Sequence, residues 1–365
     1  MVIRKIAFIV GTRPNFIKAF PLYRALKDTF DLSLFNTSQH YNDNMNKIFF
    51  EELQFNDPVV NLTLDSNTSC CFQLGEILIK LEKEINKIQP DLILVFGDVN
   101  STLAGALLSC KMKIKLAHIE SGLRCFDRNM PEEINRIIAD QVAQYHFATE
   151  TSAIENLNKE CLQNNFLVGN TMIDTLVFFK DQIKAKNTYK RLNLEKNTYI
   201  VLTLHRQNNV DDPARLSFIL DIINQLSNEM LIIWPIHPRT EKMMKKFGLE
   251  INDKILLKEP FGYLDFMNLV SNCKLVITDS GGLSEETTFL SIPCLTFRES
   301  TERPCTLIEN GGSNQLLSNN DKYAIIQKIL VEIKKKTPNN ISNRIPLWDG
   351  NASSRIKETL LRIIC

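Results

Sequence analysis

Three acidic side chains in the first half of the chain have the positions expected of an acid/base site. Asp98 and Glu120 each directly follow a short apolar run typical of a buried strand, and Glu132 lies in the first turn of a predicted helix. Carboxyl groups held close to one another and to arginine can keep different protonation states. We therefore predict that Asp98, Glu120 and Glu132 include a general acid and a general base.

The predicted helix that begins at Pro131 places Glu132 and Arg136 on one face, since residues four apart lie about one helical turn apart. Arg136 is therefore a candidate substrate-binding residue. The alternative interpretation is structural, because Glu132 and Glu133 would also stabilise the first turn of a helix. The two further carboxylates at strand ends favour the functional interpretation.

Two cations lie where the first predicted strand turns into a helix. Residues 11–18 read G-T-R-P-N-F-I-K, which is neither the dinucleotide fingerprint G-x-G-x-x-G nor a Walker loop. Arg13 and Lys18 near the N-terminus of a helix would suit a diphosphate. The alternative is a capped turn whose charges are only solvated.

The second half of the chain offers a second set of anion-binding candidates. A histidine that closes a predicted strand could donate to a phosphate, although a histidine satisfied in the core is an equally good interpretation. Ser-Gly-Gly before a predicted helix would expose N–H groups to a phosphate, and an acidic residue one turn later could bind ribose; a capped helix is the alternative. An aromatic side chain could stack on a base. These candidates are His205, Ser280, Gly281, Gly282, Glu286 and Phe261.

The other histidines give weaker indications. His118 and His146 lie inside predicted strands and are expected to be structural, whereas His40, beside Gln39, follows a strand and could approach the site. No two histidines have the spacing of metal ligands, so we predict no metal site.

The elements that must position these residues alternate in kind. Strand-like runs alternate with stretches of helical spacing, which is typical of a parallel sheet covered by helices on both faces. Ligands bind beyond the carboxyl ends of such strands, and two facing sheets would enclose a cleft. We predict an α/β fold of two doubly wound, Rossmann-like domains. The predicted strands are 6–10, 32–36, 92–96, 116–119, 145–148, 166–168, 199–204, 231–236, 255–257, 275–278 and 294–297.

The polar, Lys-rich segment 177–197 separates the two series of strands and is the predicted hinge. The N-terminal domain is then 1–176 and carries the acid/base candidates. The C-terminal domain is 177–349 and carries the Ser-Gly-Gly segment. A C-terminal helix within 350–365 could complete the N-terminal domain.

Composition excludes several classes of protein. The 365 residues suit two compact domains. Lys and Arg total 43 against 42 Asp and Glu, and a net charge of +1 argues against a nucleic-acid partner. Nine scattered cysteines without a C-x-x-C pair indicate neither zinc nor disulfides. No signal peptide or run of ~18 apolar residues is present, so we expect a soluble cytoplasmic protein without a membrane partner.

Taken in order, these motifs resemble the UDP-N-acetylglucosamine 2-epimerase family of the non-hydrolysing type. The match spans residues 11–304, and the resemblance implies the glycosyltransferase-B type fold of two facing Rossmann-like domains. It also implies no cofactor and commonly a homodimer. The matching pieces are G-T-R-P-N-F-I-K, Q-H-Y, G-D-V-N-S-T, H-I-E-S-G-L-R, M-P-E-E-I-N-R, G-N-T-M-I-D, L-H-R, H-P-R, D-S-G-G-L-S-E-E and T-E-R-P.

The resemblance implies a reversible conversion of UDP-GlcNAc into UDP-ManNAc for bacterial surface polysaccharide precursors. UDP is eliminated across C1–C2 to give 2-acetamidoglucal and then adds back. Which carboxylate takes the proton and which gives it stays open. By family position, Asp98, Glu120 and Glu132 look like the acid/base set, Arg13, Lys18 and His205 like groups that steady departing UDP, and Ser280, Gly281, Gly282 and Glu286 like the UDP-binding segment.

Two segments bear on the substrate. Hydrolysing members, which release ManNAc and UDP, resemble G-T-R-A-D-Y-G-K at the first loop, which differs from the loop here. A third group, which acts on UDP-diacetamido-uronic acids, tends to carry T-E-W where this chain reads Thr301-Glu302-Arg303. Arg303 is a candidate substrate contact. UDP-GlcNAc is favoured, with the other two reactions as alternatives. Gln39 and His40 match part of a second, activating UDP-GlcNAc site of some bacterial members.

Two other functions compete with an epimerase. A glycosyltransferase of the same fold would share the Ser-Gly-Gly segment but would not need three carboxylates at these positions. A sugar-nucleotide sensor should have lost at least one of them. Asp98, Glu120 and Glu132 are all present, which favours the enzyme.

Overall fold

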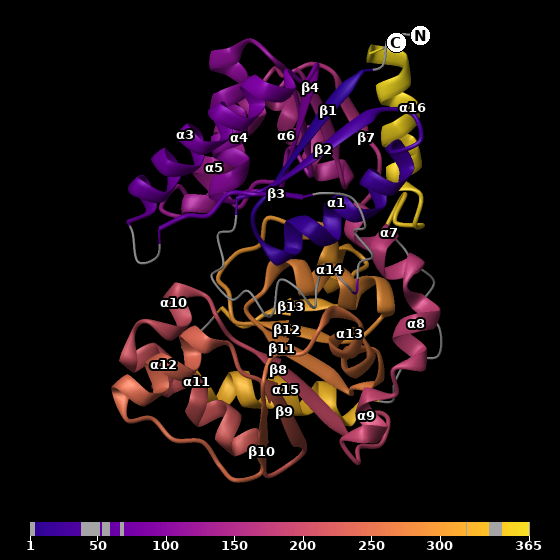
Figure 1. The fold of residues 1–365 in the computed structure, drawn as a ribbon. Helices are drawn as coiled ribbons and strands as arrows, with labels where there is room; N and C mark the ends of the chain where they lie inside the picture. Colours follow the sequence, from indigo (N-terminus) through magenta and orange to yellow (C-terminus); the bar gives the residue numbers. More distant parts are fainter. Residues whose placement is uncertain are drawn as a thin grey trace. The chain divides into compact units, whose positions relative to one another are not determined.

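The computed structural model describes residues 4–37, 52, 59–65, 69–318, 320–335 and 345–364. Gln39 and His40 lie outside the described residues. The chain forms two compact units (Figure 1). Unit 1 comprises Met1–Phe178 and Pro346–Cys365, and unit 2 comprises Phe179–Ile345. Within the described residues, no helix combines the length and the apolar character that crossing a membrane requires.

Unit 1 is built on one parallel sheet with the strand order β3-β2-β1-β4-β5-β6-β7. The chain adds β2 and β3 on one side of β1 and then continues with β4 on the other side. This reversal creates a topological switch point between β1 and β4. The strands are β1 (Lys5–Val10), β2 (Asp31–Asn36), β3 (Val59–Asn61), β4 (Leu92–Phe96), β5 (Lys115–Ile119), β6 (Tyr145–Ala148) and β7 (Asn165–Leu167).

Helices cover both faces of this sheet. Helices α3 and α5 each pack against α4 on one face, and α1, α7 and α16 form a second group. The central strand β4 reads L-I-L-V-F and is buried at every position, as expected of a parallel strand with two covered faces. The helices are α1 (Arg13–Leu26), α3 (Cys70–Ile88), α4 (Asn100–Met112), α5 (Pro131–Val142), α6 (Thr151–Lys159), α7 (Thr171–Phe178) and α16 (Ala352–Ile364).

Unit 2 repeats the same plan with the strand order β10-β9-β8-β11-β12-β13, again all parallel. Its switch point lies between β8 and β11. The strands are β8 (Tyr199–Thr203), β9 (Leu231–Pro235), β10 (Ile255–Lys258), β11 (Leu275–Thr278), β12 (Cys294–Thr296) and β13 (Asn314–Leu316).

The helices of unit 2 also form two groups. Helices α10, α12 and α15 each pack against α11, whereas α8, α9 and α14 each pack against α13. The helices are α8 (Lys180–Ala185), α9 (Thr188–Arg191), α10 (Gln207–Val210), α11 (Pro213–Leu226), α12 (Pro238–Phe247), α13 (Tyr263–Asn272), α14 (Gly281–Leu290) and α15 (Lys322–Lys334).

The predicted α/β class with two doubly wound units is confirmed. Every predicted strand is present, with ends that differ by at most one residue. The sequence missed the strands β3 and β13, which have only three residues each and lie at sheet edges. Such short runs carry too few positions for a recognisable period. The Lys-rich segment that was predicted as a hinge forms the short helices α8 and α9, both in unit 2.

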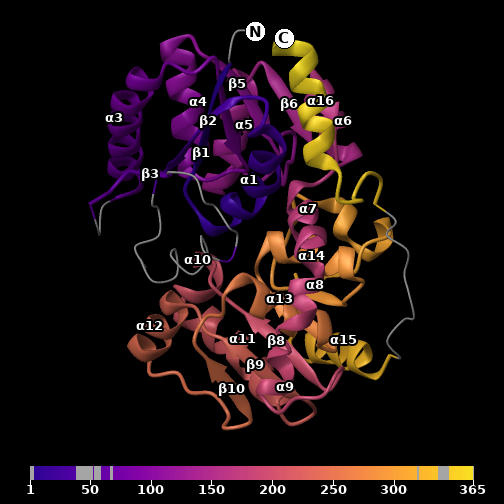
Figure 2. The same cartoon turned by 45° about the vertical axis from the view of Figure 1, so that its right-hand side comes forward.

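The C-terminal helix α16 packs on α1 and α7 of unit 1 (Figure 2). Asp174 in α7 caps it from outside the helix. Its carboxylate accepts hydrogen bonds from the amides of Ala352 (3.0 Å) and Ser353 (2.7 Å) and from the Ser353 hydroxyl (2.7 Å). Just before α16, the buried Trp348 indole donates to the Thr149 carbonyl (3.0 Å). These contacts attach the end of the chain to the N-terminal sheet.

We expect Asp174→Ala to destabilise unit 1. Two buried amides and a hydroxyl lose their acceptor, which costs about 1–3 kcal/mol. The chain has two tryptophans, Trp348 in unit 1 and Trp234 in unit 2. In a Trp234→Phe background, tryptophan fluorescence during urea unfolding therefore reports on unit 1.

The matched control is Ser354→Ala, because Ser354 lies in the same first turn of α16 but is exposed. Its unfolding midpoint should equal that of the parent. An unchanged midpoint for Asp174→Ala would mean that the cap does not stabilise unit 1.

Candidate active site

The predicted site residues lie next to the switch point of each sheet, at the carboxyl ends of the strands. In unit 1 they follow or pack beside β1, β4 and β5. In unit 2 most of them follow β8 and β11, whereas Phe261 follows the edge strand β10 and Arg303 follows β12. Such positions are where ligands bind in open α/β sheets. Each unit therefore carries its own group of candidate residues.

In unit 1, Lys18 forms a salt bridge with Glu120. Both side chains are almost completely buried, so each charge depends on the other. Lys18 reaches this position because Asn15, one turn earlier in α1, anchors the helix start. The Asn15 side chain accepts from the amides of Gly11 and Thr12 (both 3.3 Å) and donates to the carbonyl of Phe96 at the end of β4 (2.9 Å).

Asp98 pairs with Arg136 of α5. The Arg136 guanidinium also pairs with Glu133, and the Asn135 amide donates to the Asp98 carbonyl (2.9 Å). The Asp98 side chain is 23% exposed, whereas Arg136 is buried. Arg136 therefore fixes the direction of Asp98, and its contact with substrate stays a prediction.

The two neighbouring glutamates of α5 differ in environment. Glu132 is half-buried, and its carboxylate has no hydrogen bond or ion pair to another described residue. Glu133 is buried, accepts from the amides of Cys125 (3.1 Å) and Phe126 (2.9 Å) and pairs with Arg136. Sequence reasoning treated Glu133 only as first-turn charge. The i,i+3 spacing to Arg136 was the sequence signal for its role.

In unit 2, His205 contacts Asp279, which follows β11. The ring Nδ1 lies 3.0 Å from a carboxylate oxygen, and the amides of His205 (3.0 Å) and Arg206 (2.9 Å) donate to the same carboxylate. Burial alone would raise the pKa of Asp279, but His205 and these amides outweigh it and lower the pKa to about 2. The His205 side chain is 41% exposed. Sequence reasoning did not select Asp279 as a site residue.

The Ser-Gly-Gly segment forms the start of α14. The Ser280 hydroxyl caps the helix by accepting from the Leu283 amide (3.5 Å). A Cβ on Gly281 would lie 2.7 Å from both the Arg303 guanidinium and the Glu302 carboxylate, so a larger residue would displace them. Arg303 is buried beside this turn and pairs with Glu302 and Glu285.

The other predicted residues are placed as follows. Arg13 is the first residue of α1 and is half-buried, and Phe261 is half-buried just before α13. Gly282 is half-buried in the first turn of α14, while Glu286 in the same helix is buried. Among the described residues, no cluster of three or more His, Cys, Asp or Glu could hold a metal ion.

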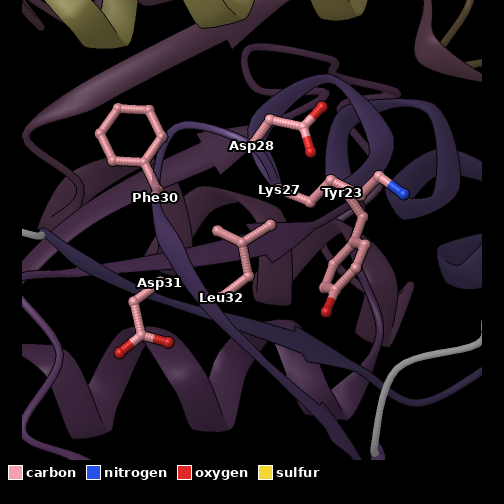
Figure 3. Close-up of a pocket in the computed structure, with 6 residues that line it drawn as sticks. All are labelled: Tyr23, Lys27, Asp28, Phe30, Asp31 and Leu32. Carbon is pink, nitrogen blue, oxygen red and sulfur yellow. The ribbon is translucent and has the colours of Figure 1, made fainter.

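A surface hollow of about 370 Å³ lies away from these residues (Figure 3). It is found where α1 ends and β2 begins, at the amino edge of the sheet in unit 1. None of the predicted site residues lines it. Its lining residues are Tyr23, Lys27, Asp28, Phe30, Asp31 and Leu32.

The chain matches the model of the UDP-N-acetylglucosamine 2-epimerase family over residues 24–361. It belongs to this epimerase family. The curated UDP-N-acetylglucosamine 2-epimerase of Methanocaldococcus jannaschii is 43% identical, and the match covers 98% of each chain. This epimerase is also 36% identical to the UDP-2,3-diacetamido-2,3-dideoxy-D-glucuronate 2-epimerase of Pseudomonas aeruginosa, over 98% of this chain and all of the other. The predicted family and the class of enzyme, an isomerase, are confirmed.

Solved structures agree with this assignment. The crystal structure of the M. jannaschii UDP-GlcNAc 2-epimerase in complex with UDP-GlcNAc and UDP superposes with a TM-score of 0.90 at 42% identity. The superposition covers 98% of this epimerase and 99% of that chain.

We expect Asp279 to make the stability of unit 2 depend on pH. Its folded pKa of about 2 lies below the ordinary value of 3.8, so its contribution is complete above about pH 4 and is lost as the pH falls towards 2. The contribution is roughly 2 kcal/mol. Urea unfolding followed by Trp234 fluorescence in a Trp348→Phe background should show that Asp279→Asn flattens the pH dependence in this window.

Asp253→Asn is the control, because Asp253 is an exposed carboxylate of the same unit. It should leave the pH dependence unchanged. Identical acid profiles for the parent and Asp279→Asn would contradict the assigned pairing with His205.

Proposed function

We propose that this epimerase interconverts UDP-GlcNAc and UDP-ManNAc by eliminating UDP and adding it back, and that it serves surface polysaccharide precursor synthesis. One observation carries the proposal. Asp98 and Glu120 lie at the ends of the adjacent strands β4 and β5, and each is paired with its own cation, Arg136 and Lys18. The M. jannaschii relative that was solved with UDP-GlcNAc and UDP supports the choice of substrate.

The chemistry explains why paired carboxylates are needed. No carbonyl group acidifies the C2 proton of the sugar, so departure of UDP must lead, and positive charge develops at C1. As the C1–O bond breaks, its electron pair leaves with UDP. A base then takes the C2 proton, and the electron pair of the C2–H bond forms the C1=C2 double bond. Carboxylates near the sugar stabilise the developing positive charge. The products of this half-reaction are 2-acetamidoglucal and UDP.

The second half-reaction reverses these steps on the other face of C2. A UDP oxygen attacks C1, and the double-bond electrons take a proton at C2 from an acid on the opposite face. Two proton-transfer groups are therefore required. Lys18 pairs with Glu120, and Arg136 pairs with Asp98. Glu132, which has no cation partner among the described residues, is the third member of the set, and the order of proton transfer stays open.

Unit 2 supplies the groups proposed for the leaving UDP. The His205 ring, which contacts Asp279 through Nδ1, is proposed to donate to a phosphate oxygen. The amides at the start of α14, at Gly281 and Gly282, suit the diphosphate. Arg13 is a further cation for it. Lys18 was predicted for the same role, but it pairs with Glu120, and we place it with the acid/base set.

Action on a UDP-diacetamido-uronic acid is the second candidate, because the P. aeruginosa relative carries that name. The segment Thr301-Glu302-Arg303 differs from the T-E-W of that group and favours UDP-GlcNAc. Release of free ManNAc by hydrolysis is the third.

The reaction is tested by NMR of the enzyme with UDP-GlcNAc in D2O. We expect UDP-ManNAc that carries deuterium at C2, because the proton that returns comes from a group exchanging with solvent. Free ManNAc with UDP would instead establish the hydrolysing reaction. Turnover of the diacetamido-uronate nucleotide alone would establish the second candidate.

Asp98→Asn and Glu120→Gln should each lower kcat at least about 10²-fold, because each removes a group that transfers a proton or stabilises charge at C1. Calorimetric Kd values for UDP should stay within about twofold, since neither carboxylate is among the proposed UDP contacts. Glu82→Gln, at an exposed position of α3, is the control and should keep the parent kcat. Parent-like kcat in either site variant would remove that residue from the mechanism.

A further inference from the structure

A chain of buried polar groups lies directly below the strand ends that carry Asp98 and Glu120. His118 of β5 is fully buried, and its Nδ1 lies 2.6 Å from one oxygen of Asp140 in α5. Its Nε2 lies 2.8 Å from the carbonyl oxygen of Gly97. The other oxygen of Asp140 accepts from the Gly122 amide (3.0 Å) and from Arg124 (2.7 Å).

The partners of His118 determine its hydrogen-bond roles. A carboxylate and a main-chain carbonyl can only accept, so both ring nitrogens of His118 must donate. Burial would raise the pKa of Asp140, but His118 and Arg124 outweigh it and hold the pKa below its ordinary value. The His118 ring and the Arg124 guanidinium therefore lie on either side of the Asp140 carboxylate. Arg124 in turn pairs with Glu160 (2.8 Å).

The two main-chain atoms that this set holds adjoin the candidate acid/base residues. Gly97 directly precedes Asp98, and Gly122 follows Glu120 by two residues. The backbone is left-handed at Gly97 (φ 65°), Glu120 (φ 71°) and Gly122 (φ 81°). A glutamate rarely adopts this conformation, and it persists only where surrounding contacts impose it.

The two strand ends are also in close contact with each other. A Cβ on Gly97 would lie 3.2 Å from the Glu120 carboxylate and 3.4 Å from the Lys18 amine. A shift of the Gly97 carbonyl would therefore displace Asp98 and alter the space around Glu120 at the same time. Misplacement of reacting groups by about 1 Å can cost about 10²-fold in rate.

We propose that His118 is a positioning residue of the epimerase reaction. It donates to the Gly97 carbonyl while its partner Asp140 accepts from the Gly122 amide, and together they fix Asp98 and Glu120 relative to each other. His118 is fully buried below the strand ends, so it acts through these main-chain atoms and not on the substrate. The proposal rests on the acid/base roles proposed for Asp98 and Glu120.

A second histidine provides a matched control. His146 of β6 is the register partner of His118 in the sheet and is equally buried. Its ring nitrogens also lie near two carbonyl oxygens, those of Gln163 (2.9 Å) and Asp140 (2.8 Å). Neither of these contacts involves the strand ends that carry Asp98 and Glu120.

The test compares His118→Gln with His146→Gln. Both should lower the Tm, because each leaves a buried acceptor without its donor. Only His118→Gln should also lower kcat about 10²-fold, with KM for UDP-GlcNAc and Kd for UDP within about threefold of the parent. It should also release more free 2-acetamidoglucal per UDP-ManNAc formed, because the second proton transfer is misaligned. Losses of kcat that are equal in both variants, or a parent-like kcat in His118→Gln, would overturn the proposal.

Asp140→Asn is the second variant, for the case that His118→Gln does not fold. It keeps the volume of the carboxylate but weakens the bonds to His118 and Gly122, so the same loss of kcat with little change in KM is expected. Parent-like kcat would again overturn the proposal. In protein labelled with ¹⁵N-histidine, the signals of His118 are found among those of five histidines by comparison with these variants. Two protonated ring nitrogens are expected, and one would overturn the hydrogen-bond assignment.

These outcomes separate this proposal from the proposed function. If Asp98→Asn and Glu120→Gln keep full activity, the acid/base assignment fails whatever His118 does. If both abolish turnover while His118→Gln does not alter kcat, only the positioning role fails.

Discussion

The arrangement of the site depends on the requirement that a buried charge must have a partner. Glu120 is nearly inaccessible to water at the end of β5, and an isolated carboxylate there would be very costly. Lys18 meets this requirement from α1, which in turn requires the helix to start tightly at the end of β1. The Asn15 side chain fixes that start by bonding to the end of β4. The ion pair and the Asn15 hydrogen bond together link α1 to the ends of β4 and β5 near the switch point.

The same requirement shapes both units. In unit 1, Arg136 pairs with both Asp98 and Glu133, and Asp140 is bound by Arg124 and His118. In unit 2, His205 and two main-chain amides stabilise the Asp279 anion. The switch points bring these groups together, because neighbouring parallel strands end at the same edge and the helices that follow begin there. Catalytic candidates are therefore held by the packing that also holds the sheets.

Features that depend on the local sequence could be predicted, whereas features that depend on packing between distant segments could not. Strand and helix periods, and the order of the motifs, were enough for the α/β class and for the family. The two edge strands were too short to show a period. Glu132 and Glu133 are adjacent and equally acidic in the sequence, yet only Glu133 turns inwards to bind Arg136 and the loop before α5. The phase of α5 against the sheet decides this difference.

By itself, the sequence determined which residues end the strands and which reaction class their motifs resemble. It could not determine the partner of each charged group. Lys18 and Glu120 lie 102 residues apart, and Asp98 and Arg136 lie 38 apart. Hydrophobic periods report the local exposure of a segment, whereas ion pairing depends on strand order and helix packing. Only the tertiary structure therefore decided that Lys18 serves Glu120, that Asp279 serves His205, and that His118 connects the ends of β4 and β5.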